Sequence, residues 1–171
     1  MSLEKWAEYG WLKAEPTSPG EIADLLGIVH RDLHDAKVEA ISEDRRFEAA
    51  FNAARTAANV ALRASGYRTS VQVCHHLKTI ESLELTLQAE PRLIQKMRVF
   101  SKKRNATSYD SAGNVSDHEL DEAINVADQL RQSVIAWLRA NHPELMNKSS
   151  NFLVGRHRSG VSNLERSPGP T

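Results

Sequence analysis

The sequence has one cysteine, no long apolar run and no net charge, and each of these features argues against a class of protein. The single Cys74 forms neither an internal disulfide nor a cysteine zinc cluster, which favours a cytoplasmic protein. No run of about eighteen apolar residues occurs, so no membrane span is expected. The 22 basic side chains are balanced by 22 acidic ones, which argues against a protein that coats nucleic acid with a generally basic surface.

Secretion is not expected either. The segment from Met1 to Trp6 lacks the basic-then-apolar order of a signal peptide. The chain of 171 residues is long enough to bury a core without disulfides or metals. Apolar periodicity stops near Met146, after which Ser, Gly, Asn, Pro and Arg dominate. We therefore expect a single domain over residues 1–146 and a flexible tail over residues 147–171.

The apolar residues recur at helical spacing, whereas alternating runs of strand length are scarce, which predicts an all-α fold. Ser18-Pro19-Gly20-Glu21 and Ser116-Asp117-His118-Glu119 have the spacing of capping boxes at helix starts. Gly66 supplies a helix stop. Helices are expected over residues 3–13, 18–40, 42–65, 70–88, 91–106 and 116–141.

The stretch from Arg92 to Arg104 contains six basic residues and no acidic one. On a helix, Arg92, Lys96 and Lys103 lie within about 40° of one another and form a basic ridge that suits phosphate contacts. The alternative is a solvated helix face, or one whose charges pair with nearby Glu81, Glu84 or Glu119. The candidate nucleic-acid-binding residues are Arg92, Lys96, Lys102 and Lys103.

Arg104 differs from its basic neighbours because helical arithmetic puts it on the apolar face, near Met97 and Phe100. A charge on that face needs a partner, a cleft or an interface. Asn105 follows directly, and Tyr109-Asp110 comes at the expected helix end. Guanidinium, amide, phenol and carboxylate groups gathered there can bind a phosphate or a base, or can form a structural arginine–carboxylate lock.

The histidines suggest no metal or cofactor site. His30 and His34 have a spacing that suits a metal but lack a convincing third ligand. His75 and His76 lie on adjacent faces of a helix and do not ligate one metal together. No glycine-rich phosphate loop or serine-nucleophile motif is present, so no cofactor is expected.

Three segments occur in an order that resembles a known family. Residues 46–66 resemble the second core helix of the HEPN superfamily, the higher eukaryotes and prokaryotes nucleotide-binding domain. Residues 74–80 resemble the histidine-containing start of its next helix, and residues 103–110 are similar to the arginine-centred motif before its last helix. The resemblance covers about residues 18–141.

This resemblance implies a bundle of four or five helices, here with a short N-terminal helix, and usually a homodimer in bacterial or archaeal cytoplasm. Many relatives are metal-independent ribonucleases of toxin–antitoxin or phage-defence systems, encoded beside a nucleotidyltransferase-like or antitoxin partner. Their signature is an arginine, often followed by Asn, and a histidine a few residues later. Arg104 and Asn105 match it, but Tyr109 occupies the histidine position, and His118 stands fourteen residues after Arg104.

Three hypotheses follow, and the least favoured is a small-molecule or metal enzyme that uses His30, His34, His75 or His76. In the first, a HEPN-like protein binds RNA or a nucleotide phosphate through Arg104, Asn105 and the basic ridge. A weak or degenerate ribonuclease activity is an extension of this hypothesis, with Arg104, Asn105 and Tyr109 as the catalytic candidates. Tyrosine, with an ordinary pKa of about 10, exchanges protons near neutral pH only when strongly tuned. In the second, the protein is a non-catalytic helical dimerisation or interaction module in which Arg104, Tyr109 and Asp110 are structural.

Overall fold

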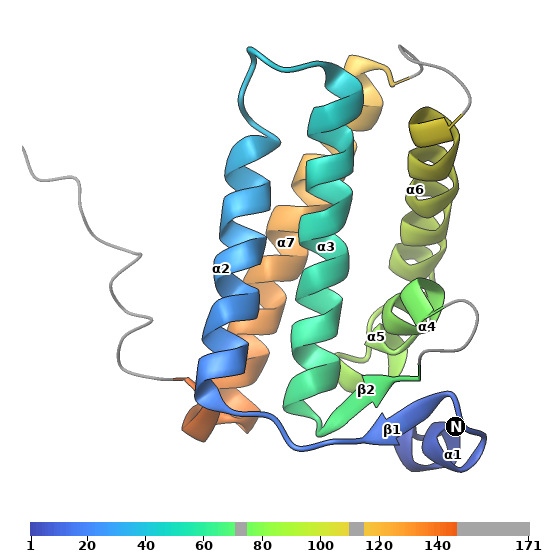
Figure 1. Ribbon diagram of the computed structural model, residues 1–171, viewed down its shortest axis with the longest axis vertical. Coiled ribbons are helices and arrows are strands. Elements are labelled where there is room, and N and C mark those ends of the chain that lie inside the picture. Colours follow the sequence, from blue (N-terminus) through green and yellow to red (C-terminus); the bar gives the residue numbers. More distant parts are fainter. Residues whose placement is uncertain (71–74, 110–114, 147–171) are drawn as a thin grey trace, which may run out of the picture.

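The alanine-rich helix α3 (Glu43–Ala64) lies at the centre of the fold. All of its alanines except Ala49 are buried, so neighbouring helix backbones approach it closely. Helices α2 (Pro19–Asp35) and α7 (Asp117–Asn141) pack along it, and Figure 1 shows the three running together. The computed structural model describes residues 1–70, 75–109 and 115–146, with side chains for all of these except 106–109. The expected flexible tail lies outside the described residues.

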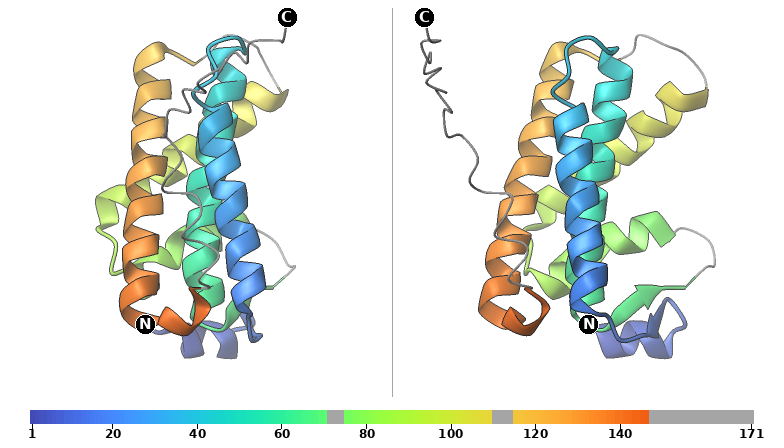
Figure 2. Two further views of the ribbon diagram at one scale, coloured as in Figure 1. Left: turned by 90° about the vertical axis from the view of Figure 1, so that its left-hand side faces the viewer. Right: turned by 60° about the vertical axis from the view of Figure 1, so that its left-hand side comes forward.

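Helix α6 (Pro91–Tyr109) packs beside α3, where Phe47 and Phe100 meet edge to face with ring centroids 5.5 Å apart. Figure 2 shows α2, α3 and α7 along the long axis of the molecule, with the short helices near one end. The described residues are mostly helical, which confirms the all-α fold and the helical bundle. Within the described ranges, no helix is long and apolar enough to cross a membrane.

The predicted helix starts are confirmed, with one difference. At α7, Ser116 accepts from the Glu119 N–H and Glu119 accepts from the Ser116 N–H, a complete capping box. At α2, Ser18 accepts from the Glu21 N–H at 3.2 Å. The expected capping box is only half formed there, because the Glu21 carboxylate instead accepts hydrogen bonds from Arg63 and Thr17.

The expected first helix over residues 3–13 is wrong beyond Glu8. Helix α1 (Leu3–Glu8) ends because Gly10 adopts φ +73°, a left-handed conformation that suits glycine. Strand β1 (Leu12–Ala14) then pairs antiparallel with β2 (Tyr67–Thr69). Three residues are too few to show the alternation by which a strand is predicted.

The expected helix over residues 70–88 is also interrupted. The described part contains α4 (His75–Glu81) and α5 (Leu83–Thr86), and residues 71–74, including Cys74, lie outside it. Ser82 separates the two helices; it is fully buried and its hydroxyl donates to the Thr79 carbonyl at 2.7 Å. Such a side-chain bond competes with the helical backbone pattern.

The lengths of α2 and α6 also differ from the prediction. Helix α2 ends at Asp35 rather than Ala40, where Arg46 Nε donates to the Ala36 carbonyl at 3.0 Å and caps the end. Helix α6 continues to Tyr109, so Arg104 and Asn105 belong to a regular helix and not to its terminus. After η1 (Pro143–Leu145), the description ends at Met146.

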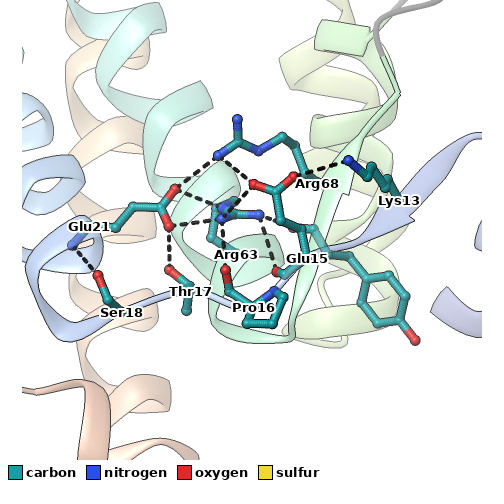
Figure 3. A network of polar contacts seen from close by, with 9 residues as sticks. Lys13, Glu15, Pro16, Thr17, Ser18, Glu21, Arg63 and Arg68 are labelled. Carbon is teal, nitrogen blue, oxygen red and sulfur yellow. Dashed lines mark hydrogen bonds and ion pairs between the residues drawn. The ribbon is translucent and has the colours of Figure 1, made fainter.

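Arg63 joins α3 to the segment before α2, and the sequence pattern did not single it out. Its side chain is only 2% exposed, and it donates to both Glu21 carboxylate oxygens at 2.9 and 2.8 Å (Figure 3). Weaker contacts of 3.4–3.5 Å join it to Glu15 and to the Pro16 and Tyr67 carbonyls. Arg68 pairs with the same two glutamates from β2, so the ends of three elements meet at one buried guanidinium.

Candidate functional site

Part of the basic ridge faces acidic side chains of α7. Lys96 pairs with Glu122, and Lys103 lies 2.9 Å from Glu119. The pKa of Glu119 is lowered to about 2, first by the Ser116 backbone N–H and then by Lys103. These contacts agree with the alternative in which the ridge pairs with nearby carboxylates. Arg92 and Lys102 are exposed, and no ion pair of either is found within the described residues.

Arg104 has the partner that its position on the apolar face required. Its Nη2 lies 3.2 Å from Oε1 of Glu48 on α3, and the side chain is 31% exposed. Arg45 pairs with the other oxygen of Glu48 at 3.0 Å. Tyr109 is the last residue of α6, with its side chain outside the described part, and Asp110 lies wholly outside it.

Arg104 also lines a cavity of about 600 Å³ between α4 and α6, which we call the α4–α6 pocket. Its cationic and amide lining consists of Arg98, Lys102, Arg104, Asn105 and Gln95. The other lining residues are Ser101, Val99, Leu77 and His76. Of the predicted site residues, the pocket brings together Lys102, Arg104 and Asn105. No carboxylate occurs among the lining residues that the structure describes.

His76 lines the pocket, although the sequence analysis considered it only for a small-molecule or metal enzyme. Arg55 on α3 places its Nη1 2.6 Å from His76 Nδ1. Because a guanidinium has only donors, Nδ1 must accept and the ring proton must reside on Nε2. Desolvation, followed by the positive charges of Arg55, His75 and Arg104, lowers the pKa of His76 to about 4. His76 is therefore neutral near neutral pH and offers an N–H donor.

We expect Arg55→Gln to raise the pKa of His76 from about 4 toward its ordinary value of 6.5, because one of the nearby positive charges is removed. In the wild type, the unfolded chain takes up this proton at a higher pH than the native state does. The stability linked to His76 is therefore lost as the pH falls from about 6.5 to about 4. Imidazole NMR titration measures the pKa, with exposed Arg139→Gln on α7 as the matched control. An unchanged titration in Arg55→Gln would contradict the assignment.

The chemistry available in the pocket is anion binding. Arg98 and Arg104 carry guanidinium groups, Lys102 an ammonium and Asn105 an amide, and His76 adds an imidazole N–H. Charged donors bind phosphate oxygens more strongly than neutral donors do. His76 is poorly suited to transfer protons near neutral pH, because its pKa is about 4 and its Nδ1 accepts a hydrogen bond from Arg55. Within the described ranges, no group of three or more His, Cys, Asp or Glu residues is placed to hold a metal.

Comparison with known proteins finds no matching family model, no matching curated protein and no matching solved structure. The HEPN resemblance therefore stays a prediction that rests on residues 46–66, 74–80 and 103–110.

Proposed function

We propose that this protein binds the phosphate group of an RNA or a nucleotide in the α4–α6 pocket. The observation that carries the proposal is a cavity of about 600 Å³ whose described lining contains three cations, an imidazole donor and two amides, without a carboxylate. Two of these cations also have a carboxylate partner outside the lining, Glu81 for Arg98 and Glu48 for Arg104, while Lys102 is exposed; a bound phosphate adds further charge-assisted contacts to these groups. Arg104 and Asn105, which the HEPN-like motif singles out, both line this cavity.

The same geometry favours binding over cleavage. Attack by a 2′-hydroxyl needs a group that exchanges protons near neutral pH, and the pKa of His76 is about 4. We therefore propose at most a weak or degenerate ribonuclease activity. Through the resemblance, the proposal includes a cytoplasmic homodimer and an antitoxin or nucleotidyltransferase-like partner protein.

The ion pair between Arg104 and Glu48 supports a second candidate function. At 3.2 Å it joins α6 to α3, as a structural lock does. Under this candidate the protein is a non-catalytic helical dimerisation or interaction module, and Arg104 serves the fold. Lys102 distinguishes the two candidates. It is exposed, and no ion pair of it is found in the described part of the chain, so it matters for phosphate binding under the first candidate but not for the fold under the second.

The test measures binding of inorganic phosphate and of a single-stranded RNA oligonucleotide to the full chain. We expect Arg104→Gln and Lys102→Gln each to weaken RNA binding by about tenfold or more, because each removes a charge-assisted contact. Affinity should also fall steeply with added salt, since phosphate contacts release counterions. Arg139→Gln, which changes an exposed arginine on α7, is the matched control and should bind as the wild type does.

Circular dichroism and light scattering separate the two candidates. If the wild type binds neither phosphate nor RNA, and Arg104→Gln loses stability or becomes monomeric, the interaction module is the better description. Retained helicity together with lost binding supports the phosphate site.

A further inference from the structure

A second cavity, of about 610 Å³, lies over α3 and is called the α3 groove here. Helix α3 forms its floor, while α2 and α4 contribute residues on either side, an arrangement that can be followed in Figure 1. Its volume is within the range of about 300–1,000 Å³ that is typical of small-molecule sites. Glu21, Arg63 and Arg68 of the Arg63 network are among its lining residues, and His76 lines both this groove and the α4–α6 pocket.

The floor of the α3 groove carries a polar stripe on a helix whose other faces are largely buried alanine. Asn52, Arg55, Thr56 and Asn59 follow one another at helical spacing and are all half-buried. Within the described part of the chain, no side-chain hydrogen bond engages the amide of Asn52 or Asn59. Each amide offers donors and an acceptor side by side, the pattern that pairs with the edge of a nucleobase.

The walls of the α3 groove supply flat and apolar surface. Leu25 and Ile28 of α2 are half-buried on one side, and His75 and His76 of α4 lie on the other with their ring centroids 3.8 Å apart. The acidic Asp32 in the same wall is held by Arg31 at 2.7 Å. Planar bases stack on aromatic rings and pack on aliphatic side chains.

We infer that the α3 groove is a nucleobase subsite, in which Asn52 and Asn59 bind the base edge and the ring packs against His75 and His76. The inference rests on the proposed function for the phosphate of the ligand, and the two cavities are neighbours because His76, which Arg55 contacts, lines both. The ligand is then a nucleotide unit that spans both cavities, with its phosphate near Arg104 and its base above α3.

The affinity test compares adenosine and uridine 5′-monophosphates with ribose 5-phosphate and inorganic phosphate, using calorimetry on the full chain. A nucleotide should bind about tenfold tighter than ribose 5-phosphate, a gain typical of one stacked base. Asn52→Ala and Asn59→Ala should each reduce that gain while inorganic phosphate binds as before. Asn141→Ala, an exposed asparagine of α7 that lines neither cavity, is the matched control and should keep the gain.

A second measurement does not depend on phosphate. Adenosine or uridine alone, at millimolar concentration, should shift the NMR signals of the Asn52 and Asn59 side-chain amides in the wild-type protein. If phosphate binds but nucleotides bind no tighter than ribose 5-phosphate, the subsite is refuted while the proposed function stands. If phosphate fails to bind, the nucleoside titration still decides: shifted amides support the subsite, and unshifted amides overturn it.

Discussion

Arg63→Met is expected to lower the free energy of unfolding by about 2–3 kcal/mol, because it removes the charge-assisted hydrogen bonds of a buried guanidinium, while Glu21 keeps Thr17 and Arg68 as partners. The Arg63 side chain is 2% exposed and donates to both carboxylate oxygens of Glu21 at 2.9 and 2.8 Å. Methionine fills part of the volume but leaves that carboxylate and the nearby carbonyls of Pro16 and Tyr67 without this donor. Urea denaturation followed by circular dichroism measures the loss.

Arg68→Met is the matched control for Arg63→Met. Arg68 pairs with the same Glu15 and Glu21 carboxylates but is 51% exposed, so its loss should cost less than about 1 kcal/mol. Arg63→Lys should not restore stability, because an ammonium lacks the planar fork that binds both oxygens of Glu21. Equal losses for Arg63→Met and Arg68→Met would show that the buried network does not stabilise this end of the bundle.

Phe47→Ala is expected to cost about 3–5 kcal/mol, because it leaves a cavity between α3 and α6. Phe47 is fully buried and meets Phe100 edge to face at 5.5 Å. Its neighbour Glu48 holds Arg104, so the same packing that supports the core also positions the α4–α6 pocket. The denaturation midpoint should fall, and phosphate binding should weaken if α6 shifts relative to α3.

Val99→Ala is the control for Phe47→Ala. Val99 lies on α6 but is 54% exposed, so its truncation should change stability by about 0.5 kcal/mol or less. A loss below about 1 kcal/mol in Phe47→Ala would mean that the site collapses around the deletion and that the α3–α6 contact is not a main support of the fold.

The helix starts were predictable because their causes are local. Ser18 and Ser116 cap their helices through N–H groups three residues away, and Gly66 adopts φ +85° where α3 ends. The strands were not predictable in the same way. Leu12 is paired with Thr69, which is far from it in the sequence. Each of the two strands is also too short to show the alternation of apolar and polar residues that predicts a strand. Likewise, the break between α4 and α5 occurs at Ser82, whose buried hydroxyl donates to the Thr79 carbonyl, and that burial depends on the tertiary structure.

The candidate site was predictable in part. The position of Arg104 on the apolar face required a partner, and the structure places Glu48 there. The sequence analysis considered His75 and His76 only as metal ligands, and their positions on adjacent faces of a helix argued against a shared metal. The role of His76 depends on Arg55, twenty-one residues earlier in the chain and on another helix. The two residues are on different helices, so no helical spacing rule relates them and the sequence pattern did not predict their hydrogen bond.

Three features are encoded locally along the chain: the helical architecture, the close packing on the alanines of α3, and the need for the charge of Arg104 to find a partner. These follow from hydrophobic periodicity and short-range hydrogen bonds, which act within a few residues. The tertiary structure decided which charges neutralise one another and which face a cavity. It paired Lys96 and Lys103 with α7 and Arg104 with Glu48 of α3, and it placed Lys102, Arg104 and His76 around one pocket. Electrostatic environment depends on distance in space, and only folding brings α3, α4 and α6 together.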